Sequence, residues 1–189
     1  MSDQFLYTDV RDPLAKPLID ALTEEYDRRY GDFYNVEGTV REMQKYPPEV
    51  FAPPHGNFVL LLRNGQAIGG GAFKRFDEHT AEFKRVWTDA NLRRQGLARK
   101  LLRELEAQAQ RQGYTRIFLT TGCRQPEAVG LYLSEGYRGL FDPATDPEVL
   151  RSLPFEKALK AAERDAPIHS GGYTARSGWY NESVAQAAS

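Results

Sequence analysis

The stretch from Asn57 to Gly122 constrains the fold most, because its pattern of apolar residues changes from extended to helical and back. Two apolar runs, NFVLLLR and QAIGGGAF, flank Asn64-Gly65, a favoured two-residue hairpin turn. TAEFKRVWTD continues the extended pattern, and leucines spaced by four from Leu97 to Leu105 then predict an amphipathic helix that ends at Gly113. TRIFLTTG is a nearly continuous apolar run, which favours a strand covered on both faces.

Elements on both sides of this stretch complete the predicted fold. Asp12 suits a helix cap and Pro13 the first helical position, and apolar residues then recur every four positions up to Tyr26. Further helices are expected at residues 39–45 and 126–135, and further strands at 137–140 and 153–159. The order of helix, hairpin, strand, helix, strand, helix and two strands predicts one α/β domain with a mixed sheet.

Composition limits the class of protein. The chain has 189 residues, enough for one domain with a sizeable core, and 27% charged and 41% hydrophobic residues are typical of a soluble globular protein. A formal net charge of −1 argues against a nucleic-acid binder, which usually has a basic balance. Cys123 is the single cysteine, so a disulfide within the chain and a cysteine-based zinc site are excluded. One free thiol and the lack of a signal-peptide core or long apolar run favour a cytoplasmic protein without membrane contact.

The composition changes near residue 160, so we expect a domain at residues 1–159 and an extension at 160–189. The extension is rich in Gly, Ser and Ala but contains Tyr173, Trp179 and Tyr180, which a purely disordered tail seldom needs. We therefore expect an irregular segment docked on its own domain or on a neighbouring subunit, the second of which would give a homodimer. A different interpretation makes it the docking segment of an interaction protein.

The segment RRQGLARKLL, from Arg93 to Leu102, joins an extended run to the leucine-rich helix. Gly96 removes side-chain bulk and Ala98 keeps the next turn slim, so a ligand can approach the backbone closely. The first N–H groups of a helix lack intrahelical partners and carry the positive end of its dipole, which suits an anion such as a diphosphate. Two simpler interpretations stay open: the glycine marks only a turn, and the basic residues form only a solvated helix face.

Two motifs in this part of the chain resemble motifs of the GNAT superfamily of N-acetyltransferases. Arg93-x-x-Gly96-x-Ala98 after TAEFKRVWT looks like the acetyl-CoA-binding motif of that superfamily. GCRQPEAVGLYLSEGYRGL resembles its next motif, a helix that ends in Leu-Tyr and is followed by Gly-Tyr. The resemblance covers about residues 57–140, and the chain looks like a small bacterial-type member.

The resemblance implies an α/β fold with a mixed, mostly antiparallel sheet, splayed between its fourth and fifth strands and flanked by helices. The pantetheine arm of acetyl-CoA would lie in the gap, with its amides on the backbone of the fourth strand and its diphosphate on the loop. The positions carried over as cofactor-binding are Val86, Trp87, Thr88, Arg93, Arg94, Gln95, Gly96, Leu97, Ala98, Arg99 and Gln125. Gln125 stands where many members carry an asparagine, and it would either contact the cofactor or only cap a helix.

Glu82 and Tyr132 are the two catalytic residues that the resemblance implies. Glu82 lies 11 residues before Arg93, as the base does in members that use a carboxylate, and it would act directly or through water. Tyr132 would protonate, or hydrogen-bond to, the sulfur of the leaving thiolate. The alternatives are a solvated Glu82 paired with Lys84 or Arg85 and a Tyr132 that serves only the core.

These features predict an acetyl-CoA-dependent N-acetyltransferase that acetylates a primary amine of a small molecule by direct attack in a ternary complex. Cys123 would have no catalytic role, since a lone thiol without an activating partner is a poor acyl carrier. The three histidines lack metal-ligand spacing, so no metal is expected. Aromatic residues that either line the acceptor pocket or only pack are Tyr26, Tyr30, Phe33 and Tyr34. The alternative function is a non-catalytic module that binds or senses an acyl-CoA, in which Glu82 and Tyr132 would be dispensable.

Overall fold

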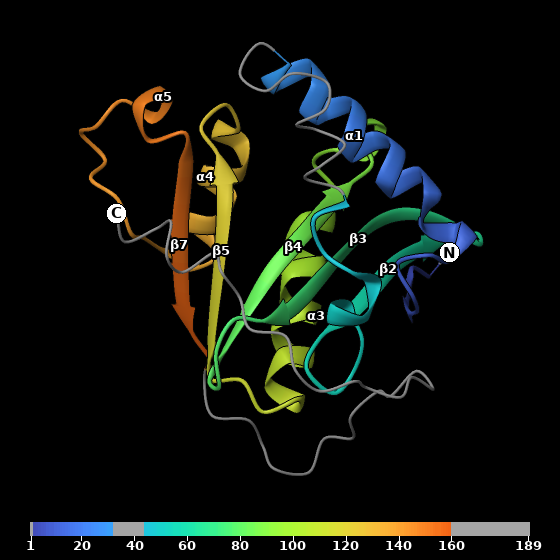
Figure 1. Ribbon diagram of the computed structural model, residues 1–189. Coiled ribbons are helices and arrows are strands. Elements are labelled where there is room, and N and C mark those ends of the chain that lie inside the picture. The colour runs from blue at the N-terminus through green and yellow to red at the C-terminus, as the bar shows by residue number, and fades with distance from the viewer. Residues whose placement is uncertain (1, 32–43, 160–189) are drawn as a thin grey trace.

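The computed structural model describes residues 2–31 and 44–159 (Figure 1). Residues 1, 32–43 and 160–189 lie outside this description, and with them most of the helix expected at 39–45, the candidate pocket residues Phe33 and Tyr34, and the whole C-terminal extension. The elements are β1 (Gln4–Tyr7), η1 (Pro13–Ala15), α1 (Lys16–Tyr30), η2 (Pro48–Phe51), β2 (Asn57–Arg63), β3 (Gln66–Arg75), β4 (Thr80–Thr88), η3 (Ala90–Leu92), α3 (Leu97–Arg111), β5 (Arg116–Gly122), α4 (Pro126–Ser134), β6 (Arg138–Gly139), α5 (Pro147–Leu150) and β7 (Ser152–Ala158).

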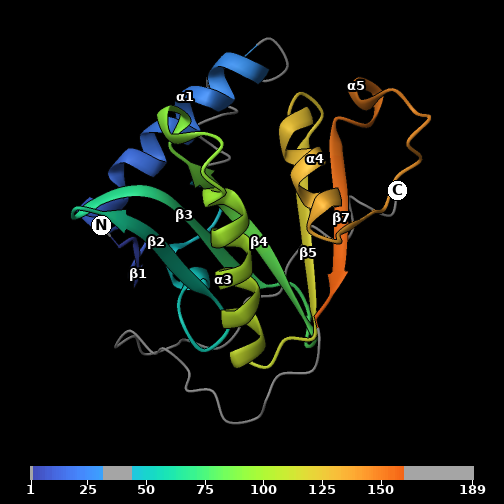
Figure 2. The same ribbon diagram turned by 180° about the vertical axis from the view of Figure 1, so that it is seen from behind.

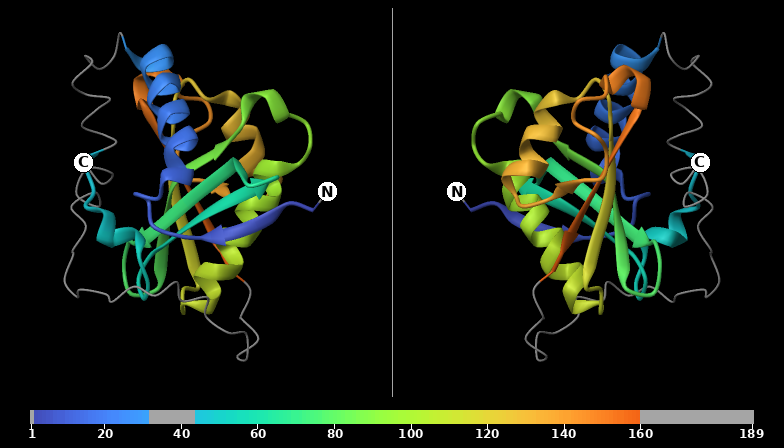
Figure 3. Two further views of the ribbon diagram at one scale, coloured as in Figure 1. Left: turned by 90° about the vertical axis from the view of Figure 1, so that its right-hand side faces the viewer. Right: turned by 90° about the vertical axis from the view of Figure 1, so that its left-hand side faces the viewer.

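The strands form one seven-stranded sheet in the order β1-β2-β3-β4-β5-β7-β6. Neighbouring strands are antiparallel except β4 and β5, which run parallel. The helix α1 covers one face of the sheet, while α3 and α4 cover the other (Figures 1 and 2). The side views in Figure 3 show α1 and α3 on opposite sides of the sheet. The expected single α/β domain with a mixed, mostly antiparallel sheet is confirmed.

Side chains of the central strands feed a separate hydrophobic cluster on each face, because successive strand residues point to opposite sides. On the α1 face, Phe58 and Leu60 pack with Leu18 of α1. On the α3 face, Val59 packs with the leucines of α3 and with aromatic residues of α4 and β7. Strand β2 is therefore apolar at nearly every position, which is why its sequence does not alternate.

The sheet splits between β4 and β5. The two strands pair only over Thr80–Glu82 and Arg116–Phe118, and beyond these residues they diverge (Figure 1). From there on β5 keeps its pairing with β7 along its whole length, up to Gly122 opposite Ser152. The splay predicted between the fourth and fifth strands is confirmed, and it leaves one edge of each strand open to a ligand.

The helix α1 bridges the split at its C-terminal end. The Tyr30 hydroxyl accepts a hydrogen bond from the backbone N–H of Arg124 at 3.1 Å, just beyond β5. A Cβ atom on Gly122 would lie 1.9 Å from this hydroxyl, so only glycine allows the contact. Arg29 adds a hydrogen bond to the Arg124 carbonyl at 2.5 Å and an ion pair with Glu127 of α4. The two halves of the sheet are thus tied together on the α1 side.

The local predictions mostly hold. Asp12 caps the first turn through Leu14 N–H at 2.9 Å, and the Asn64-Gly65 turn has positive φ at both residues, as its hairpin type requires. Strand β1 and the short helix α5 were not predicted, since four residues of each give no clear periodicity. The prediction that β5 is covered on both faces is wrong: its burial alternates, because only the face that carries Ile117 and Leu119 packs into the core cluster. None of the helices in the described residues is long and apolar enough to span a bilayer.

Candidate active site

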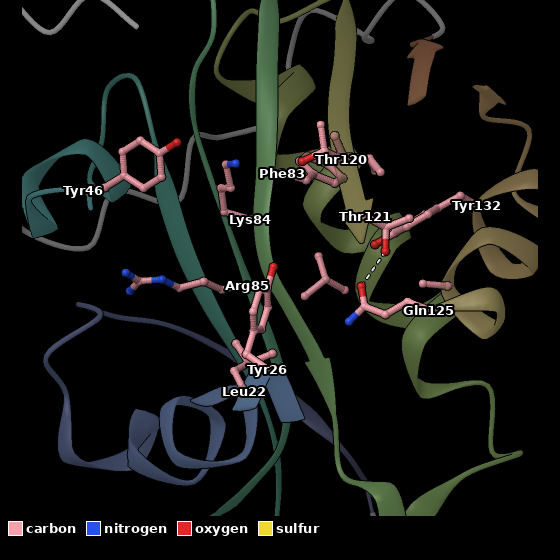
Figure 4. Close-up of a pocket in the computed structure, with 13 residues that line it drawn as sticks. Leu22, Tyr26, Tyr46, Phe83, Lys84, Arg85, Thr120, Thr121, Gln125 and Tyr132 are labelled. Atoms are coloured by element: carbon pink, nitrogen blue, oxygen red, sulfur yellow. Dashed lines mark hydrogen bonds between the residues drawn. The ribbon is translucent and has the colours of Figure 1, made fainter. Parts of the chain in front are cut away.

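A cavity of about 160 Å³ lies where β4 and β5 separate (Figure 4). Its lining comes from both strands, from α1, from α4 and from the segment before η2. The lining residues are Leu22, Tyr26, Tyr46, Phe83, Lys84, Arg85, Val86, Leu119, Thr120, Thr121, Gln125, Ala128 and Tyr132. In Figure 4, Tyr46, Lys84 and Arg85 lie on one side of the pocket, and Thr121, Gln125 and Tyr132 lie on the other.

Strand β4 carries a bulge at the pocket. Gly70 pairs with Trp87 and Ala72 with Lys84, so the single residue between them on β3 stands opposite two residues of β4, Arg85 and Val86. Arg85 has φ of 57°, a left-handed conformation that a non-glycine residue seldom adopts. Bulges bend a strand and redirect its backbone groups, and they are common beside active sites.

The three β4 positions carried over as cofactor-binding all lie beyond the point where β4 leaves β5. Val86 lines the pocket, whereas Trp87 and Thr88 pair with β3 along the other edge of the strand. The ring of Trp87 packs against the hydrophobic cluster on the α1 face. The edge of β4 that faces the split pairs with no described strand from Phe83 to Thr88, so a ligand with amides could approach this edge at Val86–Thr88.

The predicted diphosphate loop leads into α3 at the same end of the sheet as the wide part of the split (Figure 2). Gly96 is the N-cap with φ of 72°, and no side chain caps the first N–H groups of the helix. A Cβ atom on Gly96 would meet nothing within 4 Å, so the space outside the loop is open. Arg94 is also left-handed, with φ of 65°. The loop therefore exposes backbone N–H groups in the way that an anion site needs.

Side chains around the loop have defined places. Gln95 accepts a hydrogen bond from Arg63 of β2 at 2.9 Å, and Leu97 is buried in a small cluster beneath the loop. The guanidinium of Arg99 pairs with Glu135 at the end of α4. Among the predicted cofactor residues, Leu97 and Arg99 thus have side chains that connect the start of α3 to the rest of the protein.

Tyr132 packs in the core and also borders the pocket, and its catalytic role stays a prediction. Its ring packs against Tyr137 and Phe155, each with centroids 5.6 Å away, and the residue is 8% exposed. It also lines the pocket. Burial raises the pKa of Tyr132 to about 12, so the phenol stays protonated at neutral pH. The hydroxyl can therefore act as a hydrogen-bond donor.

Gln125 is the N-cap residue of α4, but its side chain does not cap the helix. The amide oxygen accepts hydrogen bonds from Thr121 Oγ1 at 2.6 Å and from the Gly122 N–H at 3.3 Å. These bonds hold the side chain at the pocket wall, where Figure 4 places it. The structure does not show the alternative role, a side-chain cap of α4, and contact with the cofactor stays a prediction.

Glu82 is buried rather than solvated. Its side chain is 1% exposed, and it does not belong to the pocket lining. The carboxylate forms ion pairs at 2.8 Å with Lys74 through one oxygen and at 2.8 Å with Lys84 through the other. Burial alone would raise the pKa of Glu82, but the charges and hydrogen bonds of the two lysines outweigh it and lower the pKa. The interpretation as a solvated strand residue is wrong, although the pairing with Lys84 is confirmed.

Sequence reasoning missed Tyr46 and the position of Lys84 and Arg85 in the pocket wall. Tyr46 comes from an aromatic, proline-containing segment without periodicity, so no pattern marked it. From the sequence, the two basic residues were named only as partners of a solvated Glu82, and the structure places both in the pocket wall. No cluster of potential metal ligands occurs among residues 2–31 and 44–159. Burial raises the pKa of the Cys123 thiol, which therefore lacks the activation of a nucleophile.

The split sheet and the glycine-started helix define an α/β fold with a ligand site between two parallel strands, and the comparisons with known proteins agree. The model of the acetyltransferase (GNAT) family matches residues 19–137. The chain is 34% identical over 150 residues to an IAA acetyltransferase of Azospirillum brasilense, covering 76% of this chain and 94% of that protein. The protein belongs to the GNAT acetyltransferase family.

Solved structures of lower identity show the same fold. A GNAT-family acetyltransferase from Staphylococcus aureus superimposes with a TM-score of 0.65 at 16% identity, over 84% of this chain and 100% of the other. The paia N-acetyltransferase from Thermoplasma acidophilum, solved in complex with coenzyme A, has a TM-score of 0.63 at 18% identity, over 84% of this chain and 99% of the other.

Proposed function

We propose that the protein is an acetyl-CoA-dependent N-acetyltransferase that transfers an acetyl group to a primary amine of a small molecule. The observation that carries this proposal is the pocket between β4 and β5, which opens at an unpaired strand edge near an uncapped helix start. Family membership supports the acetyl transfer. The relative from Azospirillum brasilense is named an acetyltransferase, and the structure from Thermoplasma acidophilum contains coenzyme A.

The loop and the strand edge fit the two ends of acetyl-CoA. Backbone N–H groups from Arg94 to Arg99 would bind the diphosphate, aided by the dipole of α3 and by the charges of Arg93 and Arg94. The open edge of β4 over Val86–Thr88 would pair with the amides of the pantetheine arm. The Gln125 amide, held by Thr121, would contact the same arm from the opposite wall. Backbone atoms do most of this work, so side-chain identity at positions 86–88 matters little.

Acetyl-CoA supplies a thioester, which an amine attacks directly so that the C–S bond breaks as the C–N bond forms. The bulge at Arg85 and Val86 would direct backbone N–H groups at the developing negative charge on the carbonyl oxygen. Tyr132 would donate a hydrogen bond to the leaving sulfur. With a pKa of about 12, it would not readily give up its proton to a thiolate, whose own pKa is roughly 8.5.

Glu82 stays a predicted base, and its surroundings favour an indirect route. The Glu82 carboxylate does not line the pocket. Lys84 connects it to the pocket, because Lys84 both pairs with this carboxylate and lines the pocket wall. We therefore propose that the proton of the attacking amine leaves through water and that Glu82 mainly positions Lys84. A carboxylate whose pKa is lowered is a weak base, which is consistent with this division of roles.

Calorimetric titration with acetyl-CoA and with free CoA tests the binding half of the proposal. Gly96→Glu places a carboxylate at the diphosphate loop and should abolish binding. Gly65→Glu is the matched control, because Gly65 also has positive φ, 75°, and open space around its Cβ position, but it lies in the hairpin turn. Binding that survives Gly96→Glu, or that Gly65→Glu removes equally, would contradict the assignment of the loop.

A screen of small primary amines for CoA release tests the catalytic half. The second candidate function is a module that senses acyl-CoA without turnover. One observation favours it: Glu82 is buried and its pKa is lowered, so it is a weak base. Tight acetyl-CoA binding with no thiol release above the rate of hydrolysis for any amine would select the sensor.

A further inference from the structure

The pocket has a hydrogen-bonding group that the proposed acetyl transfer does not use. The Tyr46 hydroxyl is buried and has no hydrogen-bond partner among the described residues, and Tyr46 lines the pocket. Buried hydroxyls nearly always have a partner, so an unmatched one in a binding pocket points to a ligand.

The position of this hydroxyl is fixed by packing on its ring. Tyr46 makes an edge-on contact with Phe51, with ring centroids 6.1 Å apart. The ammonium groups of Lys74 and Lys84 lie 4.9 and 5.5 Å from the Tyr46 centroid. In Figure 4 the hydroxyl lies on the side of the ring that faces Lys84. The Tyr46 hydroxyl and the Lys84 ammonium group therefore lie on the same wall of the pocket, and both can donate hydrogen bonds.

The charge of this wall is positive. Lys84 and Arg85 both line the pocket, and no carboxylate does so among the described residues. The nearby carboxylate of Glu82 is buried behind the wall, where it pairs with two lysines, Lys74 and Lys84. A simple amine enters as an ammonium ion, since its ordinary pKa is about 10, and it would meet like charges here. A negative group on the same molecule would instead meet two hydrogen-bond donors, the Lys84 ammonium group and the Tyr46 hydroxyl.

We propose that the acyl acceptor carries a carboxylate, which Tyr46 and Lys84 bind on the α1 side of the pocket. This inference rests on the proposed acetyl transfer, because the molecule that carries the carboxylate is the acyl acceptor of that reaction. Tyr46 and Lys84 lie across the pocket from Gln125 and Tyr132, so the carboxylate would occupy the side opposite those two residues (Figure 4). The cavity of about 160 Å³ fits an acceptor of small size.

Matched pairs of acceptors test the proposal. A panel of amino acids of increasing side-chain size is compared with their C-terminal amides, which keep the amine and the shape but lack the negative charge. CoA release gives kcat/KM for each compound, and calorimetry on the CoA-loaded protein gives affinity without turnover. The acids should exceed their amides by roughly tenfold or more, the size expected of hydrogen bonds to a charged group.

Two variants assign the preference to this wall. Lys84→Gln and Tyr46→Phe should each reduce the preference for acids, measured as the ratio of kcat/KM for an acid to kcat/KM for its amide, so that a general loss of activity does not affect the readout. Lys45→Gln is the control, because Lys45 also lies over the Tyr46 ring, at 5.5 Å, but is exposed and outside the lining. Circular dichroism and thermal unfolding confirm that each variant folds.

The outcomes separate this inference from the proposed function. Equal binding of acids and amides, no binding of any acid, or a preference that survives both variants would overturn the carboxylate site. Acetylation of amides as fast as acids would overturn it while supporting the acetyltransferase. Preferential acid binding that needs Tyr46 and Lys84 but gives no CoA release would support the carboxylate site and contradict the acetyltransferase.

Discussion

The two halves of β4 have the same backbone direction but opposite roles. The first half, Thr80–Phe83, is buried and includes the residues that pair with β5, so it belongs to the core. The second half, Lys84–Thr88, is half-buried, carries the bulge and borders the split. The change falls at the ion pair of Glu82 with Lys84, which joins a core residue to a pocket residue.

This difference shows how one strand supplies both rigidity and a binding edge. The paired half fixes the start of the split, so the edge of the second half that faces the split has no neighbouring strand among the described residues and lies in a defined place. Pre-organised backbone donors need no reorganisation when a ligand binds, which is what a catalytic pocket requires. Changes in the first half should therefore affect stability, and changes in the second half should affect binding and turnover.

The largest expected effect is on stability, from Glu82→Gln in the paired half. The substitution leaves Lys74 and Lys84 with no carboxylate between them, and removing one partner of a buried ion pair costs about 3–5 kcal/mol of the free energy of unfolding. Urea unfolding measures the loss. Lys84→Gln is the control, because it keeps the Lys74–Glu82 pair and removes the more exposed of the two lysines, whose side chain is 19% exposed against 4% for Lys74, so the loss should be smaller. A smaller loss in Glu82→Gln than in Lys84→Gln would break the comparison.

The same ion pairs predict a pH effect on stability. The folded-state pKa of Glu82 lies below its ordinary value of 4.5, so the carboxylate contributes stability that is fully present above pH 4.5. That contribution is lost as the pH falls from 4.5 through the lower folded-state pKa. The melting temperature of the wild type should therefore approach that of Glu82→Gln on acidification from pH 7 to pH 3. A constant gap between the two curves would show that folding does not lower the pKa of Glu82.

Tyr132→Phe tests the wall opposite β4. The ring stays packed on Tyr137 and Phe155, so the melting temperature should change little. Loss of the hydroxyl should lower kcat about 10-fold, as expected of one hydrogen bond to a charged group. Steady-state kinetics with a saturating acceptor measures it. An unchanged kcat would assign Tyr132 to the core alone, and a parallel loss of stability would leave packing as the explanation.

The smallest effects are expected where only the backbone acts or where a thiol has no role. Thr88→Val should leave acetyl-CoA affinity within about twofold, because the proposed contacts of the open half use main-chain atoms. Cys123→Ala should likewise keep most of the activity, since the raised pKa of the thiol argues against an acyl carrier. Loss of nearly all turnover in Cys123→Ala, with acetyl-CoA binding intact, would overturn direct transfer to the amine.

Much of the fold was predictable because local patterns and the tertiary structure agree. The Asn64-Gly65 turn, the Asp12 cap and the leucine stripe of α3 each specify an element without help from distant residues. Strand β1 gave no such signal, because its four residues gain their structure only by pairing with β2. The residues of the candidate diphosphate loop could be proposed from the sequence because they are consecutive in the chain.

The sequence by itself determined the order of the elements, the hairpin, the helix start at Gly96 and the motifs that place the chain near a known family. These features depend on neighbouring residues, whose spacing is written in the chain. Only the tertiary structure decided that Glu82 is enclosed by Lys74 and Lys84, and that Tyr46 faces the same pocket as Tyr132. Burial and the meeting of side chains from separate elements set charge state and contact, and neither can be read from spacing along one strand.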